Sequence, residues 1–554
     1  MPDHYFPKPT LGSKVWVQDY EGKKAMEARL NMQALCRYQI GTYADVINRN
    51  AVLFSNEEAF VYQSERITFA QYNERVNSLI HALQAMGIKK GDVIGILSWN
   101  CLDYVDVLGA AMKGGFIASP FNPRLQTQEL DDLINYSEAK VLFVGPEAVD
   151  MVNGMRPQIP SVQTCIALEK PAEGMPFHQN LLKTHSKSEP DAAVAPDDPM
   201  IIFYTSGTTG LPRGALYTHR RKLEDARLFV YELGLEPGSR EIMAIPLFHI
   251  AGGSYLLAFL YGRGVNVIYP KRAFDPGATL RLIQEEAATD IHIVPTNLVS
   301  MLSLPDIGTY NLDSLKRIWY AGSPMPVEVL KKGMDMLGPI FIQAYGQSES
   351  GPLVSTLSQK AHQVLDKPVE AQKVLASCGK PVPGVHVRVV DSDRNDVGLG
   401  EIGEIVVKSR SLMVAYWKRP EETRKTLVDG WLYTGDMGYY DDEGNIYLAD
   451  RKKDMIISGG ENIYPREVEE VLYRHPAVEE VAVIGVPDPY WVESVHAVVV
   501  LKQGMSVAEK ELSDFCKQHM ARYKAPKSFD FVASLPKSPQ GKILKRKLRE
   551  GDKT

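Results

Sequence analysis

One segment of the chain combines hydroxyl side chains and glycines in a pattern suited to holding an anion. Residues 204–214 read Tyr-Thr-Ser-Gly-Thr-Thr-Gly-Leu-Pro-Arg-Gly, and the candidate binding residues are Thr205, Ser206, Gly207, Thr208, Thr209, Gly210 and Arg213. Glycines let backbone N–H groups approach an anion closely, and the hydroxyl and guanidinium groups add donors. A Walker A loop would need Gly-Lys followed by Ser or Thr, which this segment lacks. A flexible polar loop is the plain alternative, but this density of small polar residues favours a polyphosphate site.

Several side chains farther along the chain have chemistry that suits a nucleotide and its metal ion. Glu349 offers the hard oxygen ligand that Mg²⁺ prefers, and Tyr345 has an aromatic face that can stack on a base. Asp436 can accept hydrogen bonds from two neighbouring hydroxyls, and Arg451 can bind phosphate or sugar. Each also has an ordinary structural explanation: a surface carboxylate, a core aromatic, a turn Asp and a solvated charge. Taken singly, these residues do not decide a function.

Taken in order, these segments resemble the motifs of the adenylate-forming superfamily, which includes acyl-CoA synthetases, luciferases and the adenylation domains of peptide synthetases. The segments that carry the resemblance are 204–214, 246–249, 321–324, 345–349, 433–436, 450–454 and 536–542. Arg213 stands where the family usually has Lys, and Ser348 stands where it has Thr, so the charge and the hydroxyl are retained. One motif would be weak, but the ordered set is specific and extends over most of the chain.

The resemblance implies roles that the residue chemistry does not select by itself. Lys542 corresponds to the lysine that, with Mg²⁺ bound by Glu349, offsets the charge that develops when a carboxylate attacks the α-phosphate of ATP. Ser348 contacts phosphate, and His249 borders the acyl pocket. The nucleotide site outside the phosphate loop comprises Gly322, Ser323, Pro324, Tyr345, Gly346, Asp436 and Arg451.

The resemblance also divides the chain into two domains. Residues 1–452 form an N-terminal adenylation domain with the ATP and acyl sites, and residues 453–554 form a C-terminal domain that carries the catalytic lysine. In this family the C-terminal domain rotates between adenylation and thioester formation. The hinge lies two positions after the motif arginine, which is Lys453 in this chain. A polar run between two predicted domains suits a hinge.

A site for coenzyme A is expected in the C-terminal domain. Segment 458–465 resembles the one that CoA ligases turn toward the active site, where Gly459 and Gly460 would leave room for a thin pantetheine arm. Tyr523 and Lys527 place an aromatic ring near a cation, which suits the adenine and phosphates of CoA, and Trp491 is a further candidate for this tunnel.

The alternation of helical and apolar segments predicts an α/β fold. We expect a large N-terminal domain of layered α/β subdomains, a small β-barrel-like subdomain and a mobile α+β C-terminal domain. The expected elements are a helix over 69–86, strands over 92–97, 140–144 and 200–204, a helical pattern from about 216, a surface connection over 170–198, β structure over 387–447, and a C-terminal helix from 465, strand over 481–486 and helix from 507.

Composition narrows the functional classes. A chain of 554 residues with 44% hydrophobic and 23% charged residues is typical of a globular protein with several domains. Its net charge of -6 argues against non-specific nucleic-acid binding. The five cysteines show no CxxC pair or zinc-ligand spacing, which predicts reduced thiols. With no signal-like N-terminus and no apolar run of about 20 residues, we expect a cytoplasmic protein without an integral membrane segment.

The leading hypothesis is therefore an AMP-forming acyl-CoA ligase that uses ATP, Mg²⁺ and coenzyme A. Two other functions stay open: an adenylating enzyme that loads a carrier protein, and a catalytically silent module that binds AMP or an acyl group. The small residues Gly252 and Gly253, beside His249, are expected to leave space for more than acetate. This predicts a medium-chain fatty, alicyclic or aromatic acid.

Overall fold

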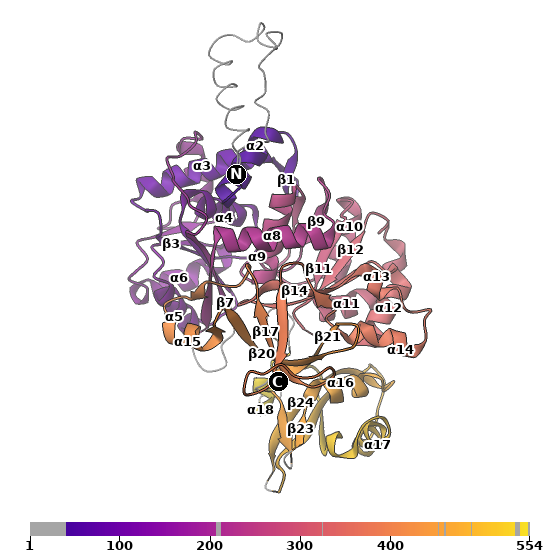
Figure 1. Cartoon of the computed structure of the whole chain (residues 1–554). Helices are drawn as coiled ribbons and strands as arrows, with labels where there is room; N and C mark the ends of the chain where they lie inside the picture. The colour runs from indigo at the N-terminus through magenta and orange to yellow at the C-terminus, as the bar shows by residue number, and fades with distance from the viewer. Residues whose placement is uncertain are drawn as a thin grey trace, which may run out of the picture.

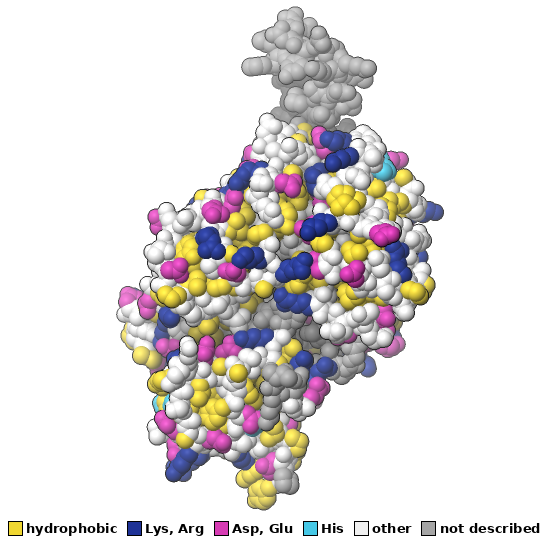
Figure 2. Space-filling view, turned by 180° about the vertical axis from the view of Figure 1, so that it is seen from behind, with side chains coloured by type: hydrophobic (Ala, Val, Ile, Leu, Met, Phe, Trp, Pro, Cys, Tyr) yellow, Lys and Arg dark blue, Asp and Glu magenta, His cyan; other side chains and the backbone are white. Residues whose placement is uncertain are grey.

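The computed structural model describes residues 40–205, 212–323, 325–451, 454–458, 461–488, 490–537 and 543–551, without the side chains of Asp450, Arg451 and Glu461. A large upper body and a smaller lower body make up the molecule (Figure 1). The space-filling view from the opposite side shows a waist between them (Figure 2).

A mostly parallel sheet fills one half of the large body. Its strands run in the order β18 (Ala415–Tyr416), β8 (Arg213–Thr218), β7 (Pro199–Thr205), β4 (Ile117–Phe121), β3 (Val93–Leu97), β5 (Val141–Val144) and β6 (Thr164–Ala167). Strands β3, β4 and β5 are buried at every position, as expected for parallel strands covered on both faces. The antiparallel pair β7–β8 places the two ends of the predicted phosphate loop next to each other.

A second sheet fills the other half of the large body. Its strands run in the order β15 (Lys380–Pro381), β14 (Gly351–Leu357), β13 (Phe341–Gln347), β12 (Arg317–Tyr320), β11 (Asp290–Ile293), β9 (Arg240–Met243), β10 (Val265–Ile268), β1 (Glu58–Tyr62) and β2 (Glu65–Thr68). Helices α8 (His219–Leu233) and α9 (Ile250–Gly262) pack against each other near the centre of the body (Figure 1). Side chains of both sheets and both helices share one hydrophobic core.

The large body contains further helices around these sheets, among which α4 (Leu102–Gly114) is buried at every position. They are α2 (Tyr43–Leu53), α3 (Phe69–Ala85), α4 (Leu102–Gly114), α5 (Thr127–Ser137), α6 (Val149–Met155), α7 (His178–Thr184), α10 (Pro276–Glu285), α11 (Pro295–Leu302), α12 (Val327–Leu337), α13 (Gln359–His362), α14 (Val369–Gln372) and α15 (Pro420–Thr426). Short 3₁₀ turns occupy Pro146–Ala148, Arg156–Gln158, Ile307–Thr309, Lys373–Ala376 and Arg522–Lys524. No described helix has the length and apolar content that a membrane crossing requires.

Two smaller sheets follow along the chain. In the first, β20 (Trp431–Tyr440) pairs with β17 (Gly403–Lys408), β19 (Leu427–Val428) and β21 (Ile446–Arg451), while β16 (His386–Val390) pairs with β17. The second, in the lower body, contains β22 (Ile456–Ser458), β23 (Glu461–Ile463), β24 (Val478–Asp488), β25 (Val492–Leu501) and β26 (Ser528–Phe531), with helices α16 (Pro465–Tyr473), α17 (Glu509–His519) and α18 (Lys545–Arg549). The lower body has its own apolar core.

The structure confirms most of the predicted elements and corrects two. Helix α3 and strands β3, β5 and β7 lie where the apolar pattern placed them, and α16 starts at Pro465. The helical pattern expected from about residue 216 is wrong at its start, because β8 extends to Thr218 in order to pair with β7. The segment 170–198 is not wholly a surface connection: it contains α7, and His178 is fully buried against Asp103.

An arginine of the lower body reaches the large body. Arg466, in the first turn of α16, donates from Nη1 to the carbonyl oxygen of Leu448 at 3.0 Å. Its Nη2 donates to the carbonyl oxygen of Ala376 at 3.1 Å. Both carbonyls belong to the large body, so the guanidinium links the first helix of the lower body to it.

Several histidines are buried in their neutral form, which makes stability depend on pH. Burial lowers the pKa of His362 to about 4, although its bond to the carbonyl of Ser358 works in the opposite direction. The other ring nitrogen lies 2.9 Å from the hydroxyl of Tyr320. A folded pKa below the unfolded value of about 6.5 means that the unfolded chain takes up the proton first. Stability is therefore lost as pH falls from about 6.5 toward 4.

We predict that His362→Gln reduces this acid sensitivity. The parent should lose about 1.5 kcal/mol more stability than the variant between pH 6.5 and 5, because over this range His362 becomes protonated in the unfolded parent but not in the folded one. Urea unfolding of the large body at both pH values measures this difference. His386→Gln removes an exposed histidine and serves as the control. An identical pH dependence in parent and His362→Gln would contradict the assignment.

Candidate active site

Three tyrosine hydroxyls connect the sheets at one place in the large body. Tyr217, on β8, donates to the backbone oxygen of Ser348 at 2.6 Å. Tyr345, at the end of β13, donates to Asp436 on β20 at 2.8 Å. Tyr416, on β18, donates to Glu349 at 2.7 Å. The first sheet, the second sheet and the small sheet therefore meet around the segment 345–349.

Asp436 is held in a fixed orientation by neighbours from another sheet. It is 5% exposed, and its Oδ2 accepts hydrogen bonds from the hydroxyl of Tyr345 and from Nε2 of Gln347. Its backbone N–H donates to Oγ1 of Thr434 at 3.0 Å. Gly435 has φ of +68°, a conformation that glycine adopts without strain. The turn and the two side-chain donors together aim the carboxylate toward β13.

Gln347 is a functional candidate that the sequence analysis missed. It occupies the variable position of the segment Tyr-Gly-x-Thr-Glu, so the resemblance gives it no role. In the structure its amide donates to Asp436 and, at 3.0 Å, to the backbone oxygen of Thr434. The signal that could have identified it is its position on the same strand as Tyr345, two residues away, which puts both side chains on one face.

Glu349 and Arg213, which belongs to the predicted phosphate loop, both contact the side chain of Tyr416. The hydroxyl of Tyr416 donates to Oε1 of Glu349, and the guanidinium of Arg213 lies 4.8 Å from the centre of the tyrosine ring. Burial raises the pKa of the Tyr416 hydroxyl, and the negative charge of Glu349 raises it further. The hydroxyl therefore keeps its proton and can donate it in a hydrogen bond. Tyr416 carries no sequence signal because it belongs to a two-residue strand that pairs with β8.

The predicted phosphate loop connects the antiparallel strands β7 and β8. Thr205 pairs with Arg213 across β7 and β8, and its hydroxyl donates to the backbone oxygen of Arg213 at 3.4 Å. The loop residues Ser206, Gly207, Thr208, Thr209 and Gly210 lie outside the described part of the chain. Gly214 is required by packing, because a Cβ there would meet Ile202 at 2.6 Å.

Two predicted nucleotide-site glycines have distinct structural reasons. Gly322 follows β12 with φ of +87°, which turns the backbone before Ser323. Gly346 lies where a Cβ would meet the backbone oxygen of Gly351 at 2.5 Å, so its absence allows β13 and β14 to approach closely. Pro324 lies outside the described residues.

Comparison with known proteins agrees with this geometry. The profile of the AMP-binding enzyme family matches residues 47–417, and the profile of the AMP-binding enzyme C-terminal domain matches residues 467–542. The chain belongs to the AMP-binding enzyme family. As predicted, it is an ATP-dependent acid–thiol ligase of the AMP-forming acyl-CoA synthetase type, with ATP, Mg²⁺ and coenzyme A as cofactors.

Relatives of this AMP-binding enzyme span nearly its whole length. A feruloyl-CoA synthase from an Amycolatopsis species is 36% identical over 506 residues, which is 90% of this chain and 97% of the relative. A fatty acid–[acyl-carrier-protein] ligase from Streptomyces coeruleorubidus is 34% identical over 525 residues, covering 94% and 98%. An anthranilate CoA ligase in complex with anthranoyl-AMP superimposes with a TM-score of 0.85 at 28% identity, covering 92% and 97%.

The predicted acyl-pocket residues of this AMP-binding enzyme lie at the start of α9. His249 caps the helix, with its Nδ1 accepting from the N–H of Ala251 at 3.2 Å. A Cβ on Gly252 would meet the backbone oxygen of Pro246 at 2.4 Å, and one on Gly253 would meet the ring of Phe203 at 2.7 Å. Close packing of α9 therefore gives both glycines a structural reason, and the expectation that they make room for substrate stays a prediction.

Some of the residues predicted to bind CoA or to act in catalysis lie in the described part of the chain. Nζ of Lys527 lies 4.2 Å from the centre of the Trp491 ring, so these two candidates do come together. Tyr523 is 47% exposed on the same lower body. Lys542, Lys453, Gly459, Gly460 and the side chain of Arg451 lie outside what the structure describes.

We predict that Asp436→Ala weakens ATP binding to this AMP-binding enzyme by roughly ten- to hundredfold, because the ribose hydroxyls lose a charged acceptor. Tyr345→Phe, which removes one of the groups that orient Asp436, should cause a smaller loss. Calorimetric titration of folded variants measures both. Asp442→Ala changes an exposed carboxylate of the same small sheet and should bind like the parent. If Asp436→Ala binds ATP as tightly as the parent, Asp436 has only a structural role in its turn.

Proposed function

We propose that the junction around 345–349 is the adenylation site of this ligase. The observation that carries the proposal is the convergence of the charged groups there: Asp436 is oriented by Tyr345 and Gln347, while Glu349 and Arg213 share the ring of Tyr416. An acceptor for sugar hydroxyls, an oxygen ligand for a metal ion and a cation for phosphate are the groups that ATP and Mg²⁺ require.

Each group has a definite task in that proposal. Asp436 accepts from both ribose hydroxyls, and its neighbours keep the carboxylate facing the sugar. Glu349 holds Mg²⁺, which when bound neutralises phosphate charge. Arg213, together with Thr205, Ser206, Thr208 and Thr209, contacts the β- and γ-phosphates as pyrophosphate leaves, and Ser348 contacts phosphate from the opposite side. These fixed charges need little reorganisation during the reaction.

The substrate carboxylate then attacks the α-phosphorus from the side of His249. The bond from the α-phosphorus to the bridging oxygen breaks, and pyrophosphate takes the electron pair. Lys542 offsets the negative charge that builds on the phosphoryl oxygens, and Arg451 binds the ribose or phosphate. In the second step the CoA thiolate attacks the acyl carbon, and AMP leaves with the electron pair of the acyl–oxygen bond.

The two steps need different positions of the lower body, and we propose the division 1–452 and 453–554 with its hinge at Lys453. Arg466 supports this arrangement, since it attaches the lower body through hydrogen bonds to two neutral carbonyls. Rotation would exchange Lys542 for Gly459 and Gly460 at the active site. CoA would then follow Tyr523, Lys527 and Trp491 on the outside of the lower body.

We propose an aromatic, alicyclic or medium-chain acid as the substrate. Support now comes from the relatives, among which are a feruloyl-CoA synthase and an indoleacetate–CoA ligase from Aromatoleum aromaticum, rather than from Gly252 and Gly253. The enzyme would act in the cytoplasm, in keeping with the free buried thiols of Cys101, Cys165, Cys378 and Cys516.

Pyrophosphate release tests the proposed function. With ATP, Mg²⁺ and a panel of aromatic and C2 to C12 acids, release should depend on the acid, and acyl-CoA should form when CoA is added. Product formation on a carrier protein that CoA cannot replace would favour the carrier-loading alternative. Absence of acid-dependent release across the panel would contradict the proposal.

We predict that Lys542→Ala lowers acyl-adenylate formation by at least about 100-fold, because the charge at the α-phosphate is no longer offset. Thioester formation from supplied acyl-AMP should remain close to the parent rate. Single-turnover measurements of the two steps separate these effects. Lys547→Ala removes an exposed lysine of α18 and is the matched control. If the rates of both steps fall equally in folded Lys542→Ala, the lysine does not act specifically in adenylation.

A further inference from the structure

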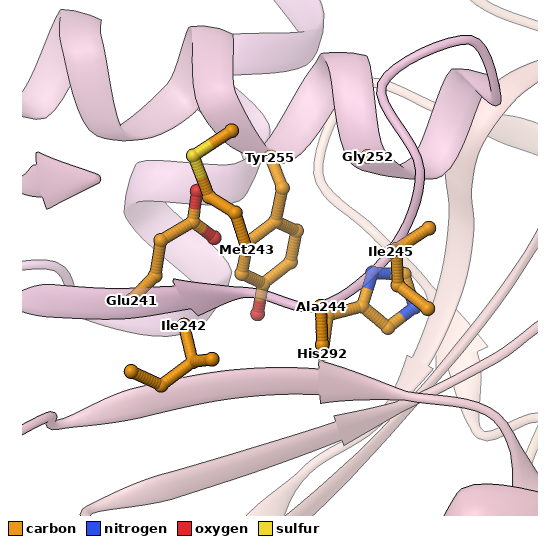
Figure 3. A pocket seen from close by; sticks show the side chains of 8 residues that line it. All are labelled: Glu241, Ile242, Met243, Ala244, Ile245, Gly252, Tyr255 and His292. Atoms are coloured by element: carbon orange, nitrogen blue, oxygen red, sulfur yellow. The ribbon is translucent and has the colours of Figure 1, made fainter. Parts of the chain in front are cut away.

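A cavity lies between α9 and the second sheet, beside the start of the helix. Strand β9 and the segment after it supply Glu241, Ile242, Met243, Ala244 and Ile245, while α9 supplies Gly252 and Tyr255 and β11 supplies His292. Figure 3 shows the rings of Tyr255 and His292 and the carboxyl group of Glu241 around the end of β9. The two rings are 5.1 Å apart between their centres.

Three polar atoms of this cavity have no hydrogen-bond partner among the residues that the structure describes. Oε1 of Glu241, the hydroxyl of Tyr255 and Nδ1 of His292 are all buried without one. The exposed fractions of these residues are 1%, 2% and 7%. Buried side-chain polar atoms are nearly always satisfied, and three unsatisfied atoms on one small cavity call for a ligand that satisfies them.

The pKa of each of these three groups is shifted in the direction that favours its uncharged form. Burial raises the pKa of Glu241 well above its usual value, with Asp290 adding to the shift. Burial also lowers the pKa of His292 to about 3, and His249 adds to that shift. The pKa of Tyr255 is raised by burial, and next by Asp290 and Glu241. Burial in this cavity therefore favours uncharged donors and acceptors over charged ones.

The charges next to the cavity are already paired. Arg317 donates from Nε to Oδ1 of Asp290 at 2.5 Å and from Nη2 to Oδ2 at 2.9 Å. Asp290 lies on β11, directly beside Glu241 on β9 and Arg317 on β12. The buried bidentate pair therefore begins on the strand next to Glu241. A charged ligand group would have to lose its water without gaining a counter-ion from these residues.

The cavity is also close to the predicted acyl pocket. Gly252, which lines it, lies three residues after His249 on the same helix. We infer that this cavity is the far end of the acyl pocket and binds a neutral hydrogen-bonding group, such as a hydroxyl or keto oxygen, on the tail of the substrate acid. This inference rests on the proposed function.

Matched pairs of acids test the inference. Each pair contains an unsubstituted acid and its hydroxylated counterpart: phenylpropenoic with 4-hydroxyphenylpropenoic acid, and C4 to C10 fatty acids with their terminal hydroxy acids. The parent should prefer the hydroxylated member of the best-fitting pair by roughly 10- to 100-fold in kcat/KM, because an unsubstituted tail leaves the three polar atoms unsatisfied. The corresponding dicarboxylic acid should be poorer than either.

Tyr255→Phe removes one hydroxyl and keeps the ring. The preference within the best pair should fall at least about fivefold, with the change in kcat/KM for the hydroxylated acid and little change for the unsubstituted one. Tyr104→Phe removes a hydroxyl that is equally buried and unpartnered, but lies in α4 outside the cavity. This control should keep the parent's preference.

The outcomes separate the inference from the proposed function. If the parent activates unsubstituted acids as well as or better than hydroxylated ones across all pairs, the ligase assignment stands and the polar cavity does not bind substrate. If a preference exists but Tyr255→Phe retains it in full, the recognition group is elsewhere and the inference fails. If no acid supports pyrophosphate release, the proposed function itself fails, and the inference fails with it.

Discussion

The hydrogen bond from Tyr345 to Asp436 is the contact on which the candidate site most depends, because it joins two sheets that do not share a strand pairing. Asp436 lies on the small sheet, and Tyr345 lies on β13 of the second sheet. A carboxylate with 5% exposure has given up most of its water, so it stays in place only when donors replace that water. Tyr345 and Gln347 provide those donors, and by doing so they fix the small sheet against the site.

The sequence was sufficient for the general architecture because its signals were local. Strand β3 and helix α3 follow from runs of apolar residues with the appropriate period, and the hydroxyl-rich loop follows from composition at 204–214. The resemblance added Asp436 and Glu349, which chemistry by itself left undecided. Family and reaction class were therefore accessible before any coordinates.

What the sequence could not provide were contacts between distant segments. Tyr416 reaches Glu349 across 67 residues, and Gln347 reaches Asp436 across 89. His178 is buried because α7 folds against Asp103, a partner 75 positions earlier that no local pattern identifies. The close packing around Gly252 and Gly253 was hidden from the sequence for the same reason: their neighbours Pro246 and Phe203 become visible only when α9 is packed into place.

The acceptors of Arg466 have a consequence for how the two bodies come apart. Both are backbone carbonyls, at Leu448 and Ala376, and every residue type supplies a carbonyl. The attachment can therefore persist while the side chains on the receiving surface change, and it responds less to ionic strength than a pair of opposite charges would. These hydrogen bonds can break without leaving an unpaired carboxylate on the large body, which would suit the rotation that we propose for the lower body.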